Sequence, residues 1–186
     1  MTTTFDTVRS TDRTETARSR IDLDALAVDA GLLALRGVAG LILAGHGAQK
    51  LFGWWGGPGF DFMVKSLGEA GYTPARFFAL LLGSTELVGG LLLALGLLTP
   101  LASAVVIGVM FNAVVGVHWQ AGLWAPNGYE LPLLFGVAAL SVGFTGPGRL
   151  SLDRHRTWAG GGAASAAVTL GLGVGSALVV MAVKAL

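Results

Sequence analysis

One glutamate, Glu86, lies in the middle of a stretch that is otherwise apolar, residues 77–117. A carboxylate near the centre of a bilayer costs about 3 kcal/mol or more unless it is paired, hydrated or protonated. A chain keeps such a residue mainly where it has a partner and a role. Two histidines, His46 and His118, flank apolar segments, and imidazoles exchange protons near neutral pH. We therefore take Glu86, His46 and His118 as candidate catalytic residues.

A second set of polar and aromatic side chains predicts a binding site around Glu86. In a helix, His46 and Lys50 share one face, with Gln49 beside them. A rise of about 1.5 Å per residue places Arg36 roughly 15 Å deeper than His46, where its long side chain reaches toward Glu86. The candidate binding residues for a quinone or another substrate are Arg36, Gln49, Lys50, Asn112, Glu130, Trp54 and Trp119.

These depths predict a polar cavity that opens outward from an apolar bundle. Such a cavity suits a quinone headgroup or another small polar molecule, with its tail between helices. Lys50 and Arg36 would neutralise Glu86 or stabilise a developing oxyanion. No covalent cofactor is indicated. The two histidines and Glu86 are not grouped in a short motif, so we expect no metal site.

Each of these residues also has a structural interpretation, and the sequence leaves both open. Arg36 and Glu86 would form a buried ion pair in any case, because charges inside a membrane must be paired. Lys50 would reach toward lipid headgroups, and Asn112 would join two helices. Glu130 would favour a helix N-terminus. The tryptophans would anchor the outer interface.

Composition indicates a multi-pass membrane protein. The 186 residues are 53% hydrophobic and only 12% charged, with mean hydropathy +0.70, whereas a soluble domain carries about 25% charged residues. The net charge of +1 implies no nucleic-acid partner. There is no cysteine, which excludes a dithiol relay and thiolate metal ligation within this chain.

The apolar segments predict an all-α integral membrane protein, with a four-helix transmembrane bundle and a fifth C-terminal transmembrane helix. Each span needs about 20 apolar residues. Thr99-Pro100 separates the second span from the third, because proline interrupts a helix. A short amphipathic stretch, 61–71, precedes the second span. The expected spans are residues 31–52, 75–98, 101–117, 130–145 and 162–185.

The charged ends predict the topology. Residues 1–29 mix both charge signs and lack the order of a signal peptide, so we expect a mobile cytoplasmic arm with a short surface helix from about residue 21. With the N-terminus inside, seven Lys/Arg residues lie on the inner side and four on the outer side. In the fifth stretch, Gly171 and Gly175 form a small-residue face, for packing on the bundle or for a homo-oligomer contact.

Several motifs resemble the DoxX family. They are Arg36 followed by His46-Gly-Ala-Gln-Lys-Leu-Phe-Gly-Trp54, then Glu86-Leu-Val-Gly-Gly90, Gly96-Leu-Leu-Thr-Pro100, His118-Trp119, Asn127-Gly-Tyr-Glu130 and Thr145-Gly-Pro-Gly-Arg-Leu-Ser-Leu-Asp153. The resemblance covers about residues 31–153. It implies a DoxX-like four-helix core over 30–153, followed over 154–186 by a basic linker and the fifth helix.

The resemblance implies a protein of the bacterial inner membrane with a redox context. Related DoxD proteins are similar to the membrane subunit of thiosulfate:quinone oxidoreductase, and some relatives resemble anchors for thiol-stress complexes. We therefore expect a membrane subunit for quinone-linked oxidation of a small sulfur or thiol compound, or for oxidative-stress detoxification. The alternatives are a non-catalytic anchor that recruits soluble redox enzymes and, third, a small-molecule transporter, although no inverted repeat is evident.

Overall fold

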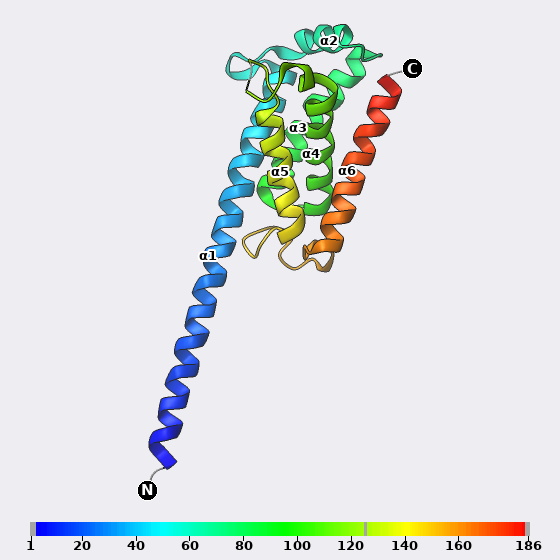
Figure 1. Ribbon diagram of the computed structural model, residues 1–186. Helices are drawn as coiled ribbons and strands as arrows, with labels where there is room; N and C mark the ends of the chain where they lie inside the picture. The colour runs from blue at the N-terminus through cyan, green and yellow to red at the C-terminus, as the bar shows by residue number, and fades with distance from the viewer. Residues whose placement is uncertain (1–2, 125, 185–186) are drawn as a thin grey trace.

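The computed structural model describes residues 3–124 and 126–184, with side chains described from residue 23 onward. Its helices form an upright bundle with a small helix lying across one end (Figure 1). That end is called the α2 end below, and the opposite end, where residues 146–162 link two helices, is called the linker end. The α-helices are α1 (Thr3–Phe52), α2 (Gly59–Glu69), α3 (Ala75–Leu95), α4 (Thr99–Asn112), α5 (Glu130–Thr145) and α6 (Ala163–Lys184).

Four of the described helices are long and apolar enough to cross a membrane. They comprise residues 23–52 of α1, α3, α4 with the turns that follow it, and α6. Helix α5 has 16 residues, or about 24 Å, which is slightly less than the roughly 30 Å of a hydrocarbon core. The predicted all-α membrane bundle is confirmed, and the C-terminal helix has the length of a span.

Helix α1 differs from our expectation for the N-terminal arm. It is one helix from Thr3 to Phe52, and it projects far beyond the bundle (Figure 1). A separate surface helix was therefore the wrong prediction for residues 21–29. The physical reason is that no glycine or proline precedes Gly31, so nothing ends the helix before the span. Residues 1–2 lie outside the described residues.

Helices α1 and α3 approach closely through glycines. A Cβ atom built at Gly47 would lie 2.4 Å from the backbone nitrogen of Leu87, and one at Gly90 would lie 2.6 Å from that of Ala44. A Cβ at Gly40 would lie 2.5 Å from the Gly90 carbonyl oxygen. Small residues on facing helices allow backbones to meet in this way. This contact fixes the depth of α1 residues relative to α3 residues.

The turn between α3 and α4 explains where these two helices begin and end. Gly96 follows α3 with φ +60°, a left-handed conformation that glycine adopts without strain. Pro100 occupies the first turn of α4, where a missing N–H costs no helical hydrogen bond. Thr99-Pro100 therefore separates the two spans as predicted, but as the start of α4.

Helix α6 packs along α4 through Gly173 rather than through the glycine pair singled out in the sequence. A Cβ at Gly173 would lie 2.7 Å from the Ala104 carbonyl oxygen. No atom lies within 4 Å of such a Cβ at Gly171 or Gly175. Those two glycines face away from the bundle, so a homo-oligomer contact through them stays a prediction.

Candidate functional site

A cavity of about 730 Å³ lies toward the α2 end of the bundle. Its size falls within the range of small-molecule sites, about 300–1,000 Å³. Helices α1, α3, α4, α5 and α6 contribute to its wall, and Met63, Ser66 and Leu67 of α2 also line it. Six of the ten predicted site residues line this cavity: His46, Lys50, Glu86, Asn112, His118 and Glu130.

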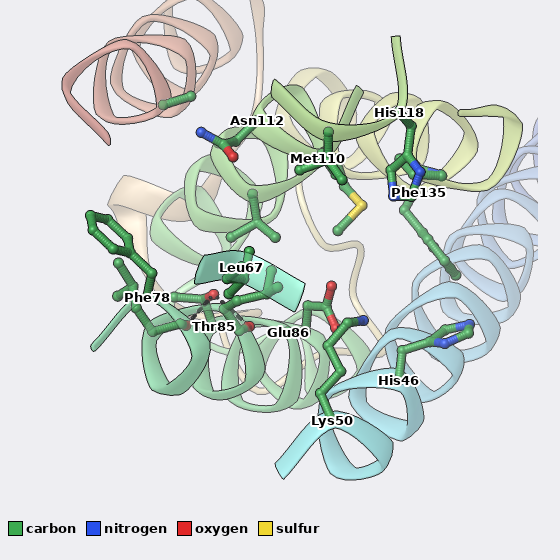
Figure 2. A pocket seen from close by; sticks show the side chains of 18 of the residues that line it. His46, Lys50, Leu67, Phe78, Thr85, Glu86, Met110, Asn112, His118 and Phe135 are labelled. Carbon is green, nitrogen blue, oxygen red and sulfur yellow. Dashed lines mark hydrogen bonds and ion pairs between the residues drawn. The ribbon is translucent and has the colours of Figure 1, made fainter. Parts of the chain in front are cut away.

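An ion pair joins α1 to α3 at the cavity wall. Lys50 Nζ lies 2.5 Å from Glu86 Oε2, and the two side chains point toward one another in Figure 2. The Glu86 side chain is 6% exposed and that of Lys50 is 22% exposed. The close glycine contact between the helices places both groups at one depth. Lys50 therefore neutralises Glu86, and its other two N–H donors remain for further acceptors.

Our predicted pairing of Arg36 with Glu86 is wrong. Arg36 is 1% exposed and donates to three backbone carbonyls, those of Ala94, Pro147 and Leu150. These carbonyls belong to the end of α3 and to the segment after α5, at the linker end. The roughly 15 Å of rise between Arg36 and His46 separates the two sites. Arg36 does not line the cavity; it satisfies carbonyls that the helix ends leave unpaired.

The two histidines lie on the wall that α1, α4 and α5 form. The ring of His46 contacts Phe135 of α5 edge-on, with 6.1 Å between centroids. His118 Nδ1 lies 2.8 Å from the carbonyl oxygen of Asn127. A carbonyl only accepts, so Nδ1 must carry the proton in this contact, and in a neutral ring Nε2 is left as an acceptor. His118 closes a π-helical turn, Ala113–His118 (η2), a feature found frequently at functional sites.

Tyr72, between α2 and α3, is a site residue that sequence reasoning missed. It lines the cavity, is 3% exposed, and its hydroxyl donates to Asn112 Oδ1 at 2.7 Å. Burial raises the pKa of the Tyr72 phenol. The adjacent Thr73-Pro74 suggested only a loop. A tyrosine after an amphipathic helix was the available signal, because a buried phenol needs a polar partner.

Lys184, at the end of α6, extends this contact. Its ammonium lies 4.3 Å from the Tyr72 ring centroid and 3.4 Å from the Gly116 carbonyl oxygen. The segment after α2 is thereby joined to the ends of α4 and α6. Among the described residues, Asn112 Nδ2 is one of four buried side-chain polar atoms that make no hydrogen bond. An unpaired buried donor is costly, so a ligand acceptor at this point would be favoured.

Three other predicted binding residues do not line the cavity. Gln49 contacts the turn after α1, where a Cβ built at Gly57 would lie 2.4 Å from the Cβ of Gln49. Trp54 is 54% exposed beside Phe52 and Trp55. Trp119 is 56% exposed and stacks on Tyr129 with 5.6 Å between centroids. Their positions fit the alternative interpretation of the tryptophans as anchors at a membrane interface.

The cavity therefore combines an apolar wall with donors and acceptors on opposite sides. Figure 2 shows Lys50, Glu86 and His46 on one side, and Asn112, Met110, His118 and Phe135 across from them. A neutral molecule with carbonyl oxygens would find donors in Lys50 Nζ and Asn112 Nδ2. A carboxyl group and an imidazole, those of Glu86 and His118, line the same space. The described residues contain no group of three or more potential metal ligands.

Comparison with known proteins gives one family. Residues 31–119 match the family model DoxX. No curated protein and no solved structure matches the chain. The matched range runs from the spanning part of α1 through α4 and η2, and it contains His46, Lys50, Glu86, Asn112 and His118. On this match, the chain contains a DoxX family domain over residues 31–119, within the membrane bundle described above.

Proposed function

We propose that this protein is the quinone-binding membrane subunit of a redox system that oxidises a small sulfur or thiol compound, or that detoxifies oxidants. The observation that carries the proposal is the cavity, which is apolar over most of its wall and holds a neutralised ion pair and an unpartnered amide donor. A redox context is often associated with the DoxX family.

The residues present fit a quinone headgroup. Lys50 Nζ and Asn112 Nδ2 would donate to its carbonyl oxygens, and the apolar walls would hold the ring and the first part of its tail. Tyr72 orients the Asn112 amide, because its hydroxyl holds Oδ1 and leaves Nδ2 free among the described groups. A bound quinone supplies two-electron, two-proton redox chemistry.

The titratable groups of the cavity wall would donate and accept the protons that quinone reduction and oxidation require. Glu86 holds or releases a proton against the charge of Lys50 at 2.5 Å. His118, with a protonated Nδ1, offers Nε2 as an acceptor. The chain has no cysteine, so the electrons of a thiol or sulfur donor would pass to the bound quinone either directly or through a partner protein. We also propose that the bundle spans the inner membrane of a bacterium and that its N-terminus lies on the cytoplasmic side.

The test is to purify the protein from a quinone-containing bacterial membrane, extract it with solvent and quantify quinone per chain. We expect close to one equivalent, together with quinone reduction by thiosulfate or a small thiol when partner proteins from the same membrane are present. Ala113 lines the cavity, so Ala113→Phe should fill it. Ala167 is exposed on α6, so Ala167→Phe serves as the control. Equal quinone in both variants, or none in the wild type, would overturn the proposal.

One observation favours a second function, a membrane anchor for soluble redox enzymes. The N-terminal part of α1 continues as a helix well beyond the bundle (Figure 1). Such a projecting helix would offer a surface for a soluble partner. Deletion of residues 1–20 would then abolish recovery of partner proteins in pull-downs while quinone content stays unchanged. Undiminished recovery would exclude this function.

A further inference from the structure

The segment after α5 forms a fixed turn at the linker end of the bundle. The backbone nitrogens of Leu152 and Asp153 donate to the carbonyls of Leu95 and Gly96, at 3.2 and 2.9 Å. Arg36 donates to the carbonyl of Leu150. The turn closes on itself through the Arg156 N–H, which donates to the Asp153 carbonyl at 2.8 Å. Its backbone is therefore held in place from several sides.

The only carboxylate within this turn is used internally. Asp153 is 1% exposed, and its Oδ2 accepts hydrogen bonds from both the backbone nitrogen and the hydroxyl of Thr99, each at 2.8 Å. It thereby caps the start of α4. The side chains of Arg154, His155 and Arg156 are exposed. Within residues 23–124 and 126–184, neither Arg154 nor Arg156 forms an ion pair.

Exposed apolar side chains alternate with these cations. Leu152 is 61% exposed and Trp158 is 47% exposed, on either side of the two arginines. The backbone contact places Leu152 beside Leu95, which is 50% exposed at the end of a membrane-spanning helix. The apolar surface of the bundle thus continues onto the turn, and the arginines lie where that surface ends. With the apolar helices inside a bilayer, this level would meet the lipid phosphates, where basic residues interact with anionic headgroups.

We propose that this turn binds an anionic phospholipid. Arg154 and Arg156 would donate to the phosphate oxygens, and guanidinium groups suit that geometry because they offer paired donors. Leu152 and Trp158 would lie against the acyl chains and the interface. A free phosphate would use only the arginines, and an acidic soluble protein would not need the continuity with the membrane-facing surface. The exposed apolar side chains of the turn, and their continuity with the membrane-facing surface, therefore favour a lipid over these two ligands.

The test is native mass spectrometry of the delipidated full chain, titrated with phosphatidylglycerol or with phosphatidylcholine of the same chain length. The wild type should prefer phosphatidylglycerol, and Arg154→Gln/Arg156→Gln should lower that preference about ten- to thirtyfold, since each basic residue near the surface contributes roughly a factor of five. Arg154→Lys/Arg156→Lys should keep most of it. Lys65→Gln, which removes an exposed cation that pairs with Glu69 on α2, should keep all of it.

Two further measurements separate the sources of the phosphate. Inorganic phosphate at millimolar concentration should not displace the lipid, and Leu152→Asn should weaken binding of both lipids. An unchanged preference in the Gln double variant would overturn the proposal, as would displacement by inorganic phosphate. Loss of an acidic soluble protein from pull-downs of that variant, with lipid preference unchanged, would assign the turn to a protein and also overturn it.

Discussion

Lys50 on α1 and Glu86 on α3 form an ion pair at 2.5 Å on the wall of the cavity. The pair resolves how this chain keeps a carboxylate inside an apolar bundle. It also places the two charges beside the groups that would contact a ligand. The same pair is thus part of both the stability of the bundle and the proposed chemistry.

Removing one partner of this pair should destabilise the protein more than removing both. Lys50→Met leaves the Glu86 carboxylate unpaired, and breaking a buried pair costs about 3–5 kcal/mol. Lys50 is 22% exposed, so we expect about 2–3 kcal/mol. Lys50→Met/Glu86→Leu should recover most of that loss. Unfolding in detergent measures the free energies, and a double variant less stable than Lys50→Met would contradict the pairing.

The close approach of α1 and α3 should depend on Gly47. In Gly47→Ala the new Cβ would meet the Leu87 backbone at 2.4 Å, so the helices must separate. We expect a loss of about 2 kcal/mol or more. Gly45→Ala is the matched control, because nothing lies within 4 Å of its Cβ. Alanine favours a helix more than glycine, so the control should be neutral or slightly more stable in the same unfolding assay.

Arg36 should matter for stability and not for the ligand. Arg36→Met leaves three carbonyls, one of them in a fully buried hydrogen bond, without their donor, and we expect a loss of about 3 kcal/mol. Arg36→Lys should restore only part of it, since one ammonium lacks the planar geometry of the guanidinium. Quinone bound per folded chain should be unchanged. A specific loss of bound quinone, with unfolding unaffected, would return Arg36 to the cavity.

Tyr72 should titrate late in alkaline solution. Burial raises the pKa of its phenol, so tyrosinate should form above pH 10 in the folded protein. The neutral phenol stabilises the fold below the unfolded-state pKa near 10, and that contribution is lost as pH rises through the folded-state value. The chain has two tyrosines, so ultraviolet absorbance of Tyr72→Phe should lack the late component. Identical titration curves would contradict the buried hydrogen bond.

The sequence predicted the helices well because each is a long apolar segment with a clear end. Residues 31–52 and 130–145 end where α1 and α5 end. The layer of His46, Lys50, His118 and Glu130 was also predicted, since helical rise gives depth directly. Depth does not give rotation about the helix axis, however. For this reason Arg36 was named beside Lys50 as a partner of Glu86, although Lys50 forms the ion pair. Gly171 was likewise singled out although Gly173 makes the contact with α4.

Tyr72 and Lys184 were missed for a related reason. Both lie near helix ends, and their contact depends on how α2 and α6 turn toward α4. The spacing of residues within one segment does not indicate how the ends of two helices pack against a third. The unpartnered amide of Asn112 is visible only once the hydroxyl that holds its oxygen is located.

Binding of a short-chain quinone to the purified, delipidated protein tests the central claim most directly. Titration calorimetry of the wild type should show about one site per chain. Ala113→Phe should abolish that site, Asn112→Leu should weaken it roughly tenfold through the lost donor, and Ala167→Phe should leave it unchanged. Equal binding by the wild type and by folded Ala113→Phe would contradict the account, as would no binding by the wild type.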